Sequence, residues 1–501
     1  MVQKCSRVAV IGAGPAGAIV TDALVKEQNF DTVRVFERKH VAGGTWVYSP
    51  STTPKIPSLK ALLEHNADLP TTIPSNFPSE TEQSESLNSH DIRFSHTGIH
   101  ENLHSNLPPK TMCFTQEPIP DIISDRSLAQ YGSNSPFRHR EVIREWVEQI
   151  FVRNDNIGLV EFHTTVESAQ KKGDEWVLTL RKEIPGDKNY WWQEVFDALV
   201  VATGHFSLPY VPQIPGLVEF DQRFPGKIRH SKHFRSADEF KGKRIIVVGG
   251  SVSAFDALHE IRQVAQHPVI SSLREPIPAF GWDAFTHPHI VIKPPISRFH
   301  NDGTIEFWDG TCVKSIDIVL FATGYDFSFP FLPELHGRTV DRRIKNLYQH
   351  VFDIKDPTLA FIGMVSGGLT FRVFEWQAVA VARLFAGRTK LPSQDVMHRW
   401  EDDRVTKRGN GVTFYDLSSE FEEYFEGLRS FAGPPVAGSQ GRILPKYDPK
   451  WKDAFVSIIV KARLGWWEEE RRRAIKQMQK TKKIVRQDVQ ASSDPTVRVR
   501  L

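Results

Sequence analysis

An α/β fold of two strand–turn–helix domains, with the second inserted into the first, is predicted by three observations. An apolar strand runs into a glycine turn and a helical pattern at residues 7–24, and the same arrangement returns at residues 243–261. Two similar stretches, "DALVVATGHFSLP" and "IDIVLFATGYDFSFP", each carry an apolar strand into Ala-Thr-Gly. Open α/β sheets bind ligands where their strands end in such turns, so we expect two dinucleotide-binding (Rossmann-like) domains.

The first turn, "GAGPAG", has the complete GxGxxG spacing between a strand and a helix. Gly12 permits the tight turn, Gly14 lets the backbone approach a pyrophosphate, and Gly17 lets helix and strand pack closely. The following strand, "TVRVFERK", brings Glu37 to where it can accept hydrogen bonds from a ribose 2′-OH. We expect a dinucleotide to be bound by Gly12, Ala13, Gly14, Pro15, Ala16, Gly17, Glu37 and Arg38.

The second turn, "GGSVSA", departs from the motif and has Gly249, Ser251 and Ala254 at its three positions. A serine adds a hydroxymethyl group where the backbone should approach phosphate, although its hydroxyl can donate to a phosphate oxygen. A purely structural strand–helix turn is the alternative. After the next strand, Arg274 can meet a 2′-phosphate and favours NADPH over NADH, although Glu275 follows it. The expected contacts are Gly249, Ser251, Ser253, Ala254 and Arg274.

The two Ala-Thr-Gly stretches enclose the second turn, and each predicts a point where the chain crosses between domains. We therefore expect the first domain to occupy residues 1–212 and the inserted domain residues 213–333. The first domain then resumes over residues 334–501, which end in a helical tail.

Composition indicates a globular protein that handles metabolites. The 501 residues are 40% hydrophobic and 25% charged, and a net charge of +3 is too small to imply nucleic acid as the main partner. The polar start lacks the features of a secretory signal, and no apolar run approaches the roughly 18 residues that a bilayer needs, so we expect a cytoplasmic protein without a transmembrane segment. Cys5, Cys113 and Cys312 are too far apart for a CxxC redox pair or a clustered zinc site, and no metal is expected.

The segment "RFPGKIRHSKHF" carries a family resemblance through Phe224, Gly226, His230 and Phe234. From about Val8 to residues 390–393 the sequence resembles a fungal-type flavin-containing monooxygenase, a class B flavoprotein monooxygenase. In that family the first turn holds FAD, the second holds NADPH, and FxGxxxHxxx(F/Y) lies between them. The resemblance therefore implies an FAD-binding domain interrupted by an NADPH-binding domain.

Three further stretches resemble the family. "ERKHVAGGTW" implies that Gly43, Gly44, Thr45 and Trp46 lie against the flavin dinucleotide. "IHENLHSNLPPKTMCF" resembles the active-site segment and implies Asn106 as the catalytic residue and a cofactor contact together with Ser105, while His100 and Ser105 stand where tyrosine and threonine are common. "VFEWQAVAVARLFAG" implies flavin contacts from Glu375 and Gln377. The alternatives are a turn cap for Asn106, a packing histidine for His230 and core filling for Trp46.

The chemistry that the resemblance implies belongs to the cofactors. NADPH reduces FAD, the reduced flavin takes up O2 as a C4a-hydroperoxyflavin, and sulfur or nitrogen of a small molecule attacks it, as in N,N-dimethylaniline monooxygenases. This explains why no Ser/His/Asp or paired-carboxylate set stands out. A flavin disulfide reductase needs a close pair of cysteines, which the three widely spaced cysteines of this sequence do not supply. A Baeyer–Villiger or N-hydroxylating monooxygenase, or a non-catalytic nucleotide-sensing flavoprotein, stays open.

Two segments lie outside these motifs. Residues 66–95 are rich in Pro, Ser, Thr and Asn, and we expect a surface insertion there, either inert or covering the substrate entrance. Residues 465–487 predict a charged helix that is solvated and partly packed in a homodimer, with attachment to an acidic membrane as the alternative. Residues 491–501 are expected to fray.

Overall fold

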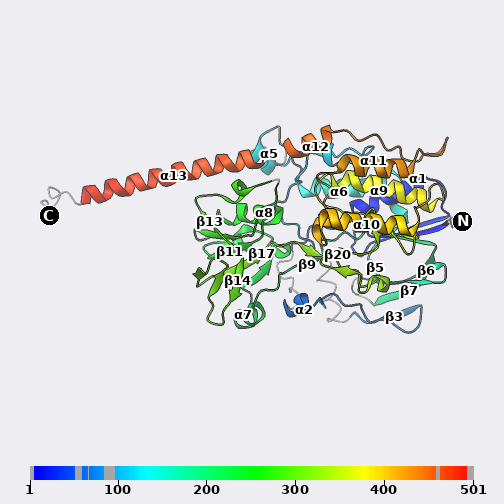
Figure 1. Cartoon of the computed structure of the whole chain (residues 1–501), viewed down its shortest axis with the longest axis horizontal. Coiled ribbons are helices and arrows are strands. Elements are labelled where there is room, and N and C mark those ends of the chain that lie inside the picture. The colour runs from blue at the N-terminus through cyan, green and yellow to red at the C-terminus, as the bar shows by residue number, and fades with distance from the viewer. Residues whose placement is uncertain are drawn as a thin grey trace. The chain divides into compact units, whose positions relative to one another are not determined.

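Figure 1 shows the computed structural model of the chain, which describes residues 5–50, 59–65, 67–83, 96–184, 186, 188–278, 280–457 and 463–492. The chain divides into two compact units. The first comprises Met1–Pro212, Lys232–Ser236 and Gly324–Phe455, and the second comprises Gln213–Ser231, Ala237–Thr323 and Val456–Leu501. The chain leaves the first unit after Pro212, re-enters it briefly at Lys232–Ser236 and returns at Gly324, and Val456–Leu501 group with the second unit.

The first unit contains a seven-stranded sheet with the order β21-β22-β23-β8-β1-β2-β4. Strands β23, β8, β1, β2 and β4 run parallel, and β21 and β22 pair antiparallel at one end. The central strands are buried apolar runs, as parallel strands covered on both faces require. The bounds are β1 Arg7–Ile11, β2 Thr32–Phe36, β4 Val160–Glu161, β8 Ala198–Val201, β21 Leu347–Tyr348, β22 Phe352–Asp353 and β23 Leu359–Phe361.

A four-stranded antiparallel sheet, ordered β3-β7-β6-β5, packs against the parallel sheet through a shared apolar core. Its long strands are β5 Thr164–Lys172, β6 Glu175–Glu183 and β7 Asn189–Phe196. The edge strand β3, Ser79–Thr81, comes from the segment expected to be a surface insertion. That segment is therefore not wholly loop, while residues 66 and 84–95 lie outside the described part of the chain. Two short antiparallel pairs complete the strands of this unit, β9 Leu208–Pro209 with β18 Tyr325–Asp326 and β19 Thr339–Val340 with β20 Arg343–Ile344.

Helix α1, Pro15–Lys26, follows the first glycine turn and lies beside α9, Thr370–Phe385 (Figure 1). Both helices are almost wholly buried because alanine and β-branched residues allow close packing on several sides. The other helices of this unit are α2 Leu59–Leu63, α4 Pro109–Met112, α5 Asp125–Tyr131, α6 Arg140–Arg153, α10 Gln394–Arg408, α11 Phe421–Ala432 and α12 Lys450–Phe455, with the 3-10 turns η1 Gly44–Trp46, η2 Ile157–Leu159, η6 Pro333–Leu335 and η7 Val412–Tyr415.

The second unit is built on a parallel five-stranded sheet with the order β10-β17-β11-β12-β13. Its small antiparallel sheet is ordered β14-β15-β16. The strand bounds are β10 Ile228–His230, β11 Ile245–Val248, β12 Val269–Ser272, β13 Ile290–Lys293, β14 Ile296–Phe299, β15 Ile305–Phe307, β16 Cys312–Val313 and β17 Ile318–Phe321. The helical segments are α7 Leu217–Arg223, α8 Val252–Ile261, η4 Ala237–Phe240 and η5 Trp282–Phe285, and η3 Ser231–His233 lies where the chain passes between units.

The expected C-terminal helix is confirmed as α13, Arg463–Ser492, and its first turns are anchored within the second unit. Trp467 is 1% exposed, donates from Nε1 to the Asp283 carbonyl at 3.0 Å, and lies 4.9 Å from the Arg262 guanidinium. The tail beyond Ser492, expected to fray, lies outside the described residues. Among the residues that are described, none of the helices is both long and apolar enough to cross a membrane.

Candidate cofactor and active site

A cavity of about 460 Å³ lies wholly within the first unit, in the size range of small-molecule and cofactor sites. It is lined by the first glycine turn, the end of β2, η1, the start of β5, the loop after β8 and the N-terminus of α9. The parallel strands β1, β2 and β8 all end at this cavity, which is where open α/β sheets bind ligands.

The glycines of the first turn lie where a Cβ would be excluded, at Gly12 and Gly17, or closely confined, at Gly14. A Cβ on Gly12, whose φ is +103°, would lie 2.8 Å from the Ala202 carbonyl oxygen, and one on Gly17 would lie 1.9 Å from the Gly12 oxygen. A Cβ on Gly14 would lie 3.2 Å from Gly44 Cα. Gly14 also caps α1, so the N-terminus of that helix faces the cavity and offers backbone N–H groups to a phosphate.

Glu37 closes the turn from the next strand. Its carboxylate is 5% exposed and accepts hydrogen bonds from the Ala13 N–H at 2.8 Å and the Lys39 N–H at 2.9 Å. Both oxygens keep a further lone pair, and Glu37 and Arg38 line the cavity. The geometry matches that of a carboxylate held ready for ribose hydroxyls.

The "GGTW" stretch forms the wall beside Gly14. Gly43 and Gly44 have φ of +134° and +56°, and the Lys39 ammonium donates to the Gly44 carbonyl at 3.0 Å. Burial lowers the pKa of Lys39 to about 8. Thr45 and Trp46 line the cavity, and the Trp46 ring lies edge-on to Phe371, with 6.4 Å between centroids.

Asn106 is an exposed side chain that lines the cavity together with Leu107 and Met112. The backbone before it is fixed, because the Ser105 N–H donates to the Arg138 carbonyl at 2.7 Å. After it come Pro108 and Pro109, which begin the short helix α4. Asn106 therefore presents a free amide edge on a restrained backbone.

Ser105 and Gln377, both expected to contact the cofactor, do not line the cavity. Ser105 is 1% exposed, and its hydroxyl donates to the Leu107 carbonyl at 2.9 Å. The Gln377 side-chain oxygen accepts from the Gly363 N–H at 2.9 Å, and Gly363 does line the cavity. Both polar side chains are already paired with neighbouring protein groups, so their contribution is to shape the backbone around the site.

The sequence patterns did not point to several residues of the cavity wall. Phe371 and Phe374 reach it from the first turn of α9, where Leu369 precedes the helix with φ of +50°. Residues 68–71 of the insertion line the cavity, and Asp68 accepts a hydrogen bond from the Ser328 hydroxyl. His205 follows the first Ala-Thr-Gly and also lines it. The repeated Ala-Thr-Gly was the signal that could have identified His205, whereas the segment at 68–71 has none.

The second turn lies at the ends of β11 and β17 in the second unit. A Cβ on Gly249, whose φ is +142°, would lie 2.4 Å from the Ala322 carbonyl oxygen, and one on Gly250 would lie 2.3 Å from the Glu275 oxygen. Ser251 is exposed at the N-cap of α8, and Ala254 is fully buried. Ser253, half-buried, lies in the first turn of the same helix.

Arg274 is exposed two residues beyond the end of β12, as is its neighbour Glu275. The Gly250 carbonyl accepts from the Ile277 N–H at 2.8 Å, which holds the loop that carries Arg274 against the turn. The loop that carries Arg274 is therefore held against the turn that starts α8, and a guanidinium near a helix N-terminus suits a phosphate group.

The segment containing Phe224, Gly226, His230 and Phe234 lies at the point where the chain passes between units. The first three belong to the second unit, where His230 is 1% exposed in β10, and Phe234 belongs to the first. The Phe234 ring lies edge-on to His100, with 5.4 Å between centroids, and burial lowers the pKa of His100 to about 3. The segment is a structural junction, since none of these side chains lines the cavity.

Comparison with known proteins places this architecture in a family. The model of the flavin-binding monooxygenase-like family matches residues 88–276 and 284–499. The chain belongs to that family. The match covers both units and includes Asn106 and the second turn, and the family assignment makes this chain an enzyme that oxidises by incorporating oxygen.

Curated relatives agree with the assignment. The chain is 26% identical to flavin-containing monooxygenase ustF2 of Aspergillus flavus, an alignment that covers 92% of this chain and 98% of that protein. It is 31% identical to flavin-containing monooxygenase FMO GS-OX-like 1 of Arabidopsis thaliana, over 87% of this chain and 82% of that one. The fungal resemblance inferred from the sequence is thereby confirmed.

Solved structures share the fold of this monooxygenase. S-allyl-L-cysteine S-oxygenase from Allium sativum superposes with a TM-score of 0.71 at 24% identity, covering 95% of this chain and 98% of that one. A cyclohexanone monooxygenase superposes with a TM-score of 0.52 at 15% identity, covering 85% and 97%. The predicted α/β architecture with two Rossmann-like domains is confirmed.

Membership of the family implies FAD and NADPH as cofactors, and the cavity of the first unit fits a flavin dinucleotide. Its turn excludes a Cβ at Gly12 and Gly17 and leaves only a tight space at Gly14, as a close backbone approach to a pyrophosphate requires. Three cavity-lining side chains carry a buried nitrogen with no hydrogen-bond partner among the described residues: Trp46 Nε1, His96 Nδ1 and His205 Nδ1. Buried polar atoms rarely stay unpaired in a complete protein, so these nitrogens indicate a polar ligand.

Proposed function

We propose that the chain uses NADPH and O2 to oxygenate soft nucleophilic sulfur or nitrogen in small molecules, with FAD held in the cavity of the first unit. The observation that carries the proposal is that Asn106 lines the same cavity as the Gly12–Gly17 turn, Glu37 and Trp46. A dinucleotide site and an unengaged amide side chain are thereby combined in one enclosure.

The bound flavin supplies the redox chemistry, and the residues of this chain orient it and exclude water. Backbone N–H groups at the start of α1 take the pyrophosphate, and Glu37 takes the ribose hydroxyls. Asn106 offers an amide that can both donate and accept a hydrogen bond at the reacting edge of the flavin. Phe371 and Phe374 give this end of the cavity an apolar wall that strengthens such hydrogen bonds.

NADPH is proposed to bind the second unit at Gly249, Ser251, Ser253 and Ala254, with Arg274 on its 2′-phosphate. The support is the pairing of an exposed α8 N-terminus with an exposed guanidinium in the loop packed against the turn.

Oxygenation of a soft nucleophile is better supported than insertion of oxygen beside a ketone. The Allium sativum structure of the same fold is described as an S-oxygenase, whereas the cyclohexanone monooxygenase fold matches less well. Phe234 supports the same choice, because family members that insert oxygen beside ketones usually have tryptophan at that position. A Baeyer–Villiger oxidation is the alternative, and supplying a thioether and a cyclic ketone to the same preparation separates the two.

The test is rapid mixing of NADPH-reduced protein with O2 while the flavin absorbance is followed. We expect reoxidation in two phases, the second accelerated by an added thioether that is recovered as its sulfoxide. Asn106→Ala should merge the phases and release peroxide while FAD stays bound, since one preorganised hydrogen bond at the reacting edge contributes a few kcal/mol. One-step reoxidation of the unaltered protein, with no oxygenated product, would contradict the proposal. Two-phase reoxidation in Asn106→Ala would contradict the assignment of Asn106.

A further inference from the structure

Helix α9 presents two neighbouring faces to two different parts of the first unit. Phe371 and Phe374 line the cavity, and the residues that follow each of them, Arg372 and Glu375, bond to residues 110–115. Residues three apart in a helix lie on one face, so each face acts as a unit. A single rigid helix therefore forms one cavity wall and also holds the segment that follows Asn106.

Arg372 fixes the short helix α4 through its carbonyl groups. Its Nε donates to the Thr111 carbonyl at 3.1 Å and its Nη2 to the Lys110 carbonyl at 2.5 Å. Its guanidinium also lies 4.3 Å from the Trp451 ring. Only Leu107 and Pro108 separate Asn106 from α4, and the two consecutive prolines restrict the backbone between them. Any shift of α4 is therefore passed directly to Asn106.

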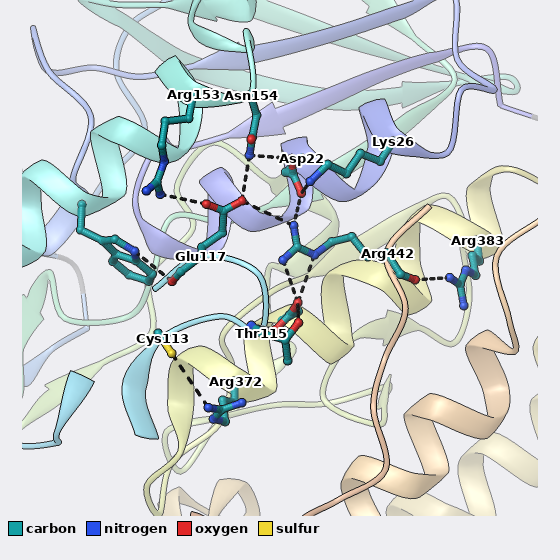
Figure 2. A network of polar contacts seen from close by, with 12 residues as sticks. Asp22, Lys26, Cys113, Thr115, Glu117, Arg153, Asn154, Arg372, Arg383 and Arg442 are labelled. Carbon is teal, nitrogen blue, oxygen red and sulfur yellow. Dashed lines mark hydrogen bonds and ion pairs between the residues drawn. The ribbon is translucent and has the colours of Figure 1, made fainter. Parts of the chain in front are cut away.

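Glu375 is a fully buried carboxylate that holds the other end of α4. It accepts from the Thr115 N–H at 2.7 Å and from the Thr115 hydroxyl at 2.6 Å. Figure 2 shows Thr115 beside Arg442, whose Nε and Nη2 donate to the same carboxylate at 3.0 and 2.8 Å. The carboxylate thus joins the segment after Asn106 to the C-terminal part of the unit.

Arg442 lies on the strap that connects α11 to α12, residues 433–449, and its side chain is fully buried. It also pairs with Asp22 in α1, the helix that starts at the first glycine turn, and lies 3.9 Å from Glu117 (Figure 2). Burial alone would lower the pKa of Arg442, but the carboxylates of Glu375 and Asp22 raise it, so the guanidinium stays charged. Arg383 holds the strap by donating to the carbonyls of Gly433 and Arg442.

We infer that Arg372, Glu375, Thr115 and Arg442 are positioning residues that fix Asn106 against the flavin, so the C-terminal strap contributes to the active site without touching it. A buried ion pair is held in place because removing one partner leaves an uncompensated charge. Because Arg372 bonds α9 to α4, Glu375 bonds α9 to Thr115 and Arg442, and Arg442 also pairs with Asp22 in α1, these elements and the strap keep one arrangement. The inference rests on the proposed role of Asn106.

The experiment is a double-mutant cycle between Thr115→Val and Asn106→Ala, each measured as the complete FAD-loaded enzyme. The readout is peroxide released per NADPH oxidised in the presence of a thioether. Thr115→Val removes only the hydroxyl bond to Glu375 and leaves the backbone bond. We expect it to raise the ratio of peroxide to sulfoxide about tenfold, with FAD content unchanged. In the Asn106→Ala background the same substitution should add nothing, because it acts through Asn106.

Arg442→Lys and Glu401→Gln complete the design. Arg442→Lys keeps the charge but loses the paired Nε and Nη2 donors to Glu375 Oε1, and we expect a peroxide ratio between those of wild type and Thr115→Val. Glu401→Gln is the matched control, since Glu401 pairs with Arg343 at 2.5 Å in the same unit without contacting residues 106–117. It should lower stability and leave the ratio unchanged.

The outcomes separate this inference from the proposed function. If Asn106→Ala changes the ratio but Thr115→Val does not, or if both effects add in the double variant, the network is structural only and the inference is wrong. If Asn106→Ala itself has no effect on product or peroxide, the proposed role of Asn106 fails first.

Discussion

Both glycine turns bring a strand and the following helix close together, but the second turn leaves more space between them than the first. In each, the first glycine has a positive φ and packs on the carbonyl of the alanine in an Ala-Thr-Gly stretch, Gly12 on Ala202 and Gly249 on Ala322. The turns then diverge. The first closes on Gly17, where a Cβ would lie 1.9 Å from a carbonyl oxygen, whereas the second has Ala254 at that position. The first helix therefore approaches its strand more closely than the second.

The two turns also differ in the charged residue that is expected to contact the ribose or its phosphate. Glu37 is buried and fixed by two backbone N–H groups, but Arg274 is exposed in a loop. A site with a closed turn and a fixed carboxylate suits a cofactor that stays bound through many turnovers. A more open turn with an exposed cation suits a cosubstrate that binds and leaves. The dinucleotide motif therefore determines where a nucleotide binds, while the packing around the motif determines its affinity.

The largest difference between the two turns is expected for substitutions at their third motif positions, Gly17 and Ala254. Gly17→Ala should destabilise the protein by about 3 kcal/mol and yield mostly apoprotein, because its Cβ overlaps the Gly12 carbonyl. Ala254→Gly should cost about 1 kcal/mol, the helix propensity difference, and leave FAD bound. Urea denaturation with flavin absorbance measures both. Equal losses in the two variants would show that the turns are packed alike.

Removing the acid tests the firm binding of the first turn. Glu37→Ala leaves the Ala13 and Lys39 N–H groups without their acceptor and takes away the ribose contact, so FAD affinity should fall about a hundredfold. The measurement is titration of apoprotein with FAD by fluorescence quenching. NADPH affinity should be unaffected, and a parallel loss of both would indicate general unfolding.

Removing the cation tests the looser second turn. Arg274→Ala should raise KM for NADPH about tenfold and leave KM for NADH unchanged, because only the 2′-phosphate loses a charged partner. Steady-state kinetics with both reductants measure this. A wild type that uses NADH and NADPH with equal kcat/KM would remove the role of Arg274 altogether.

The residues that follow the two Ala-Thr-Gly stretches, His205 and Tyr325, give a comparison in pH. Burial lowers the pKa of His205 to about 4, against about 6.5 in an unfolded chain. Below pH 6.5 the unfolded chain binds a proton that the folded one does not, so stability present above that pH is lost on acidification.

His205→Phe should remove this loss, while Tyr325→Phe should not, because a tyrosine is neutral throughout this range. Between pH 7 and pH 5 wild type should lose about 1 kcal/mol more than His205→Phe, a value reduced because His205 is only half-buried by its surroundings. Chemical denaturation at both pH values checks it, and identical slopes for wild type and His205→Phe would contradict it.

The smallest effect on cofactor binding is expected at Ser251, the middle motif position of the second turn. Ser251→Gly should change KM for NADPH by about twofold or less, since Ser251 is exposed and makes no side-chain cap on α8. Gly14→Ser is the matched reverse substitution and should lower FAD content, because its Cβ would approach Gly44 Cα to 3.2 Å. Comparable effects of the two would remove the distinction between the turns.

The local motifs of this chain could be predicted because their chemistry lies within a few consecutive residues. Gly12, Gly14, Glu37, Trp46 and Asn106 all line one cavity, and their roles in binding and catalysis stay predictions. Ser105 and Gln377 do not, because a sequence pattern cannot show that a polar side chain is already paired with a neighbouring backbone group. Their assignment to direct cofactor contact stays a prediction that the cavity lining does not support.

Long-range pairings were beyond reach for a different reason. Residues 79–81 join a sheet edge, and residues 68–71 reach the cavity, although composition predicted a surface insertion, either inert or covering the substrate entrance, and indicated neither contact. Whether a segment forms an edge strand depends on the strand with which it can pair, and the local residue propensity does not contain that information. Likewise, the residues next to Arg442 in the sequence do not predict that it pairs with Asp22 and Glu375.

The two strand–turn–helix units, their order along the chain and the family can be inferred from the residues alone, because tight turns and helix N-termini need particular residues at fixed spacing. Which polar groups face the cavity and which are buried in bonds to other protein groups depends on how the described segments pack. Asn106 and Ser105 are adjacent in the chain, yet one lines the cavity and the other bonds to Leu107. The difference arises because the Ser105 side chain is buried and bonded to Leu107 and to the Arg138 N–H, contacts that a sequence pattern does not show.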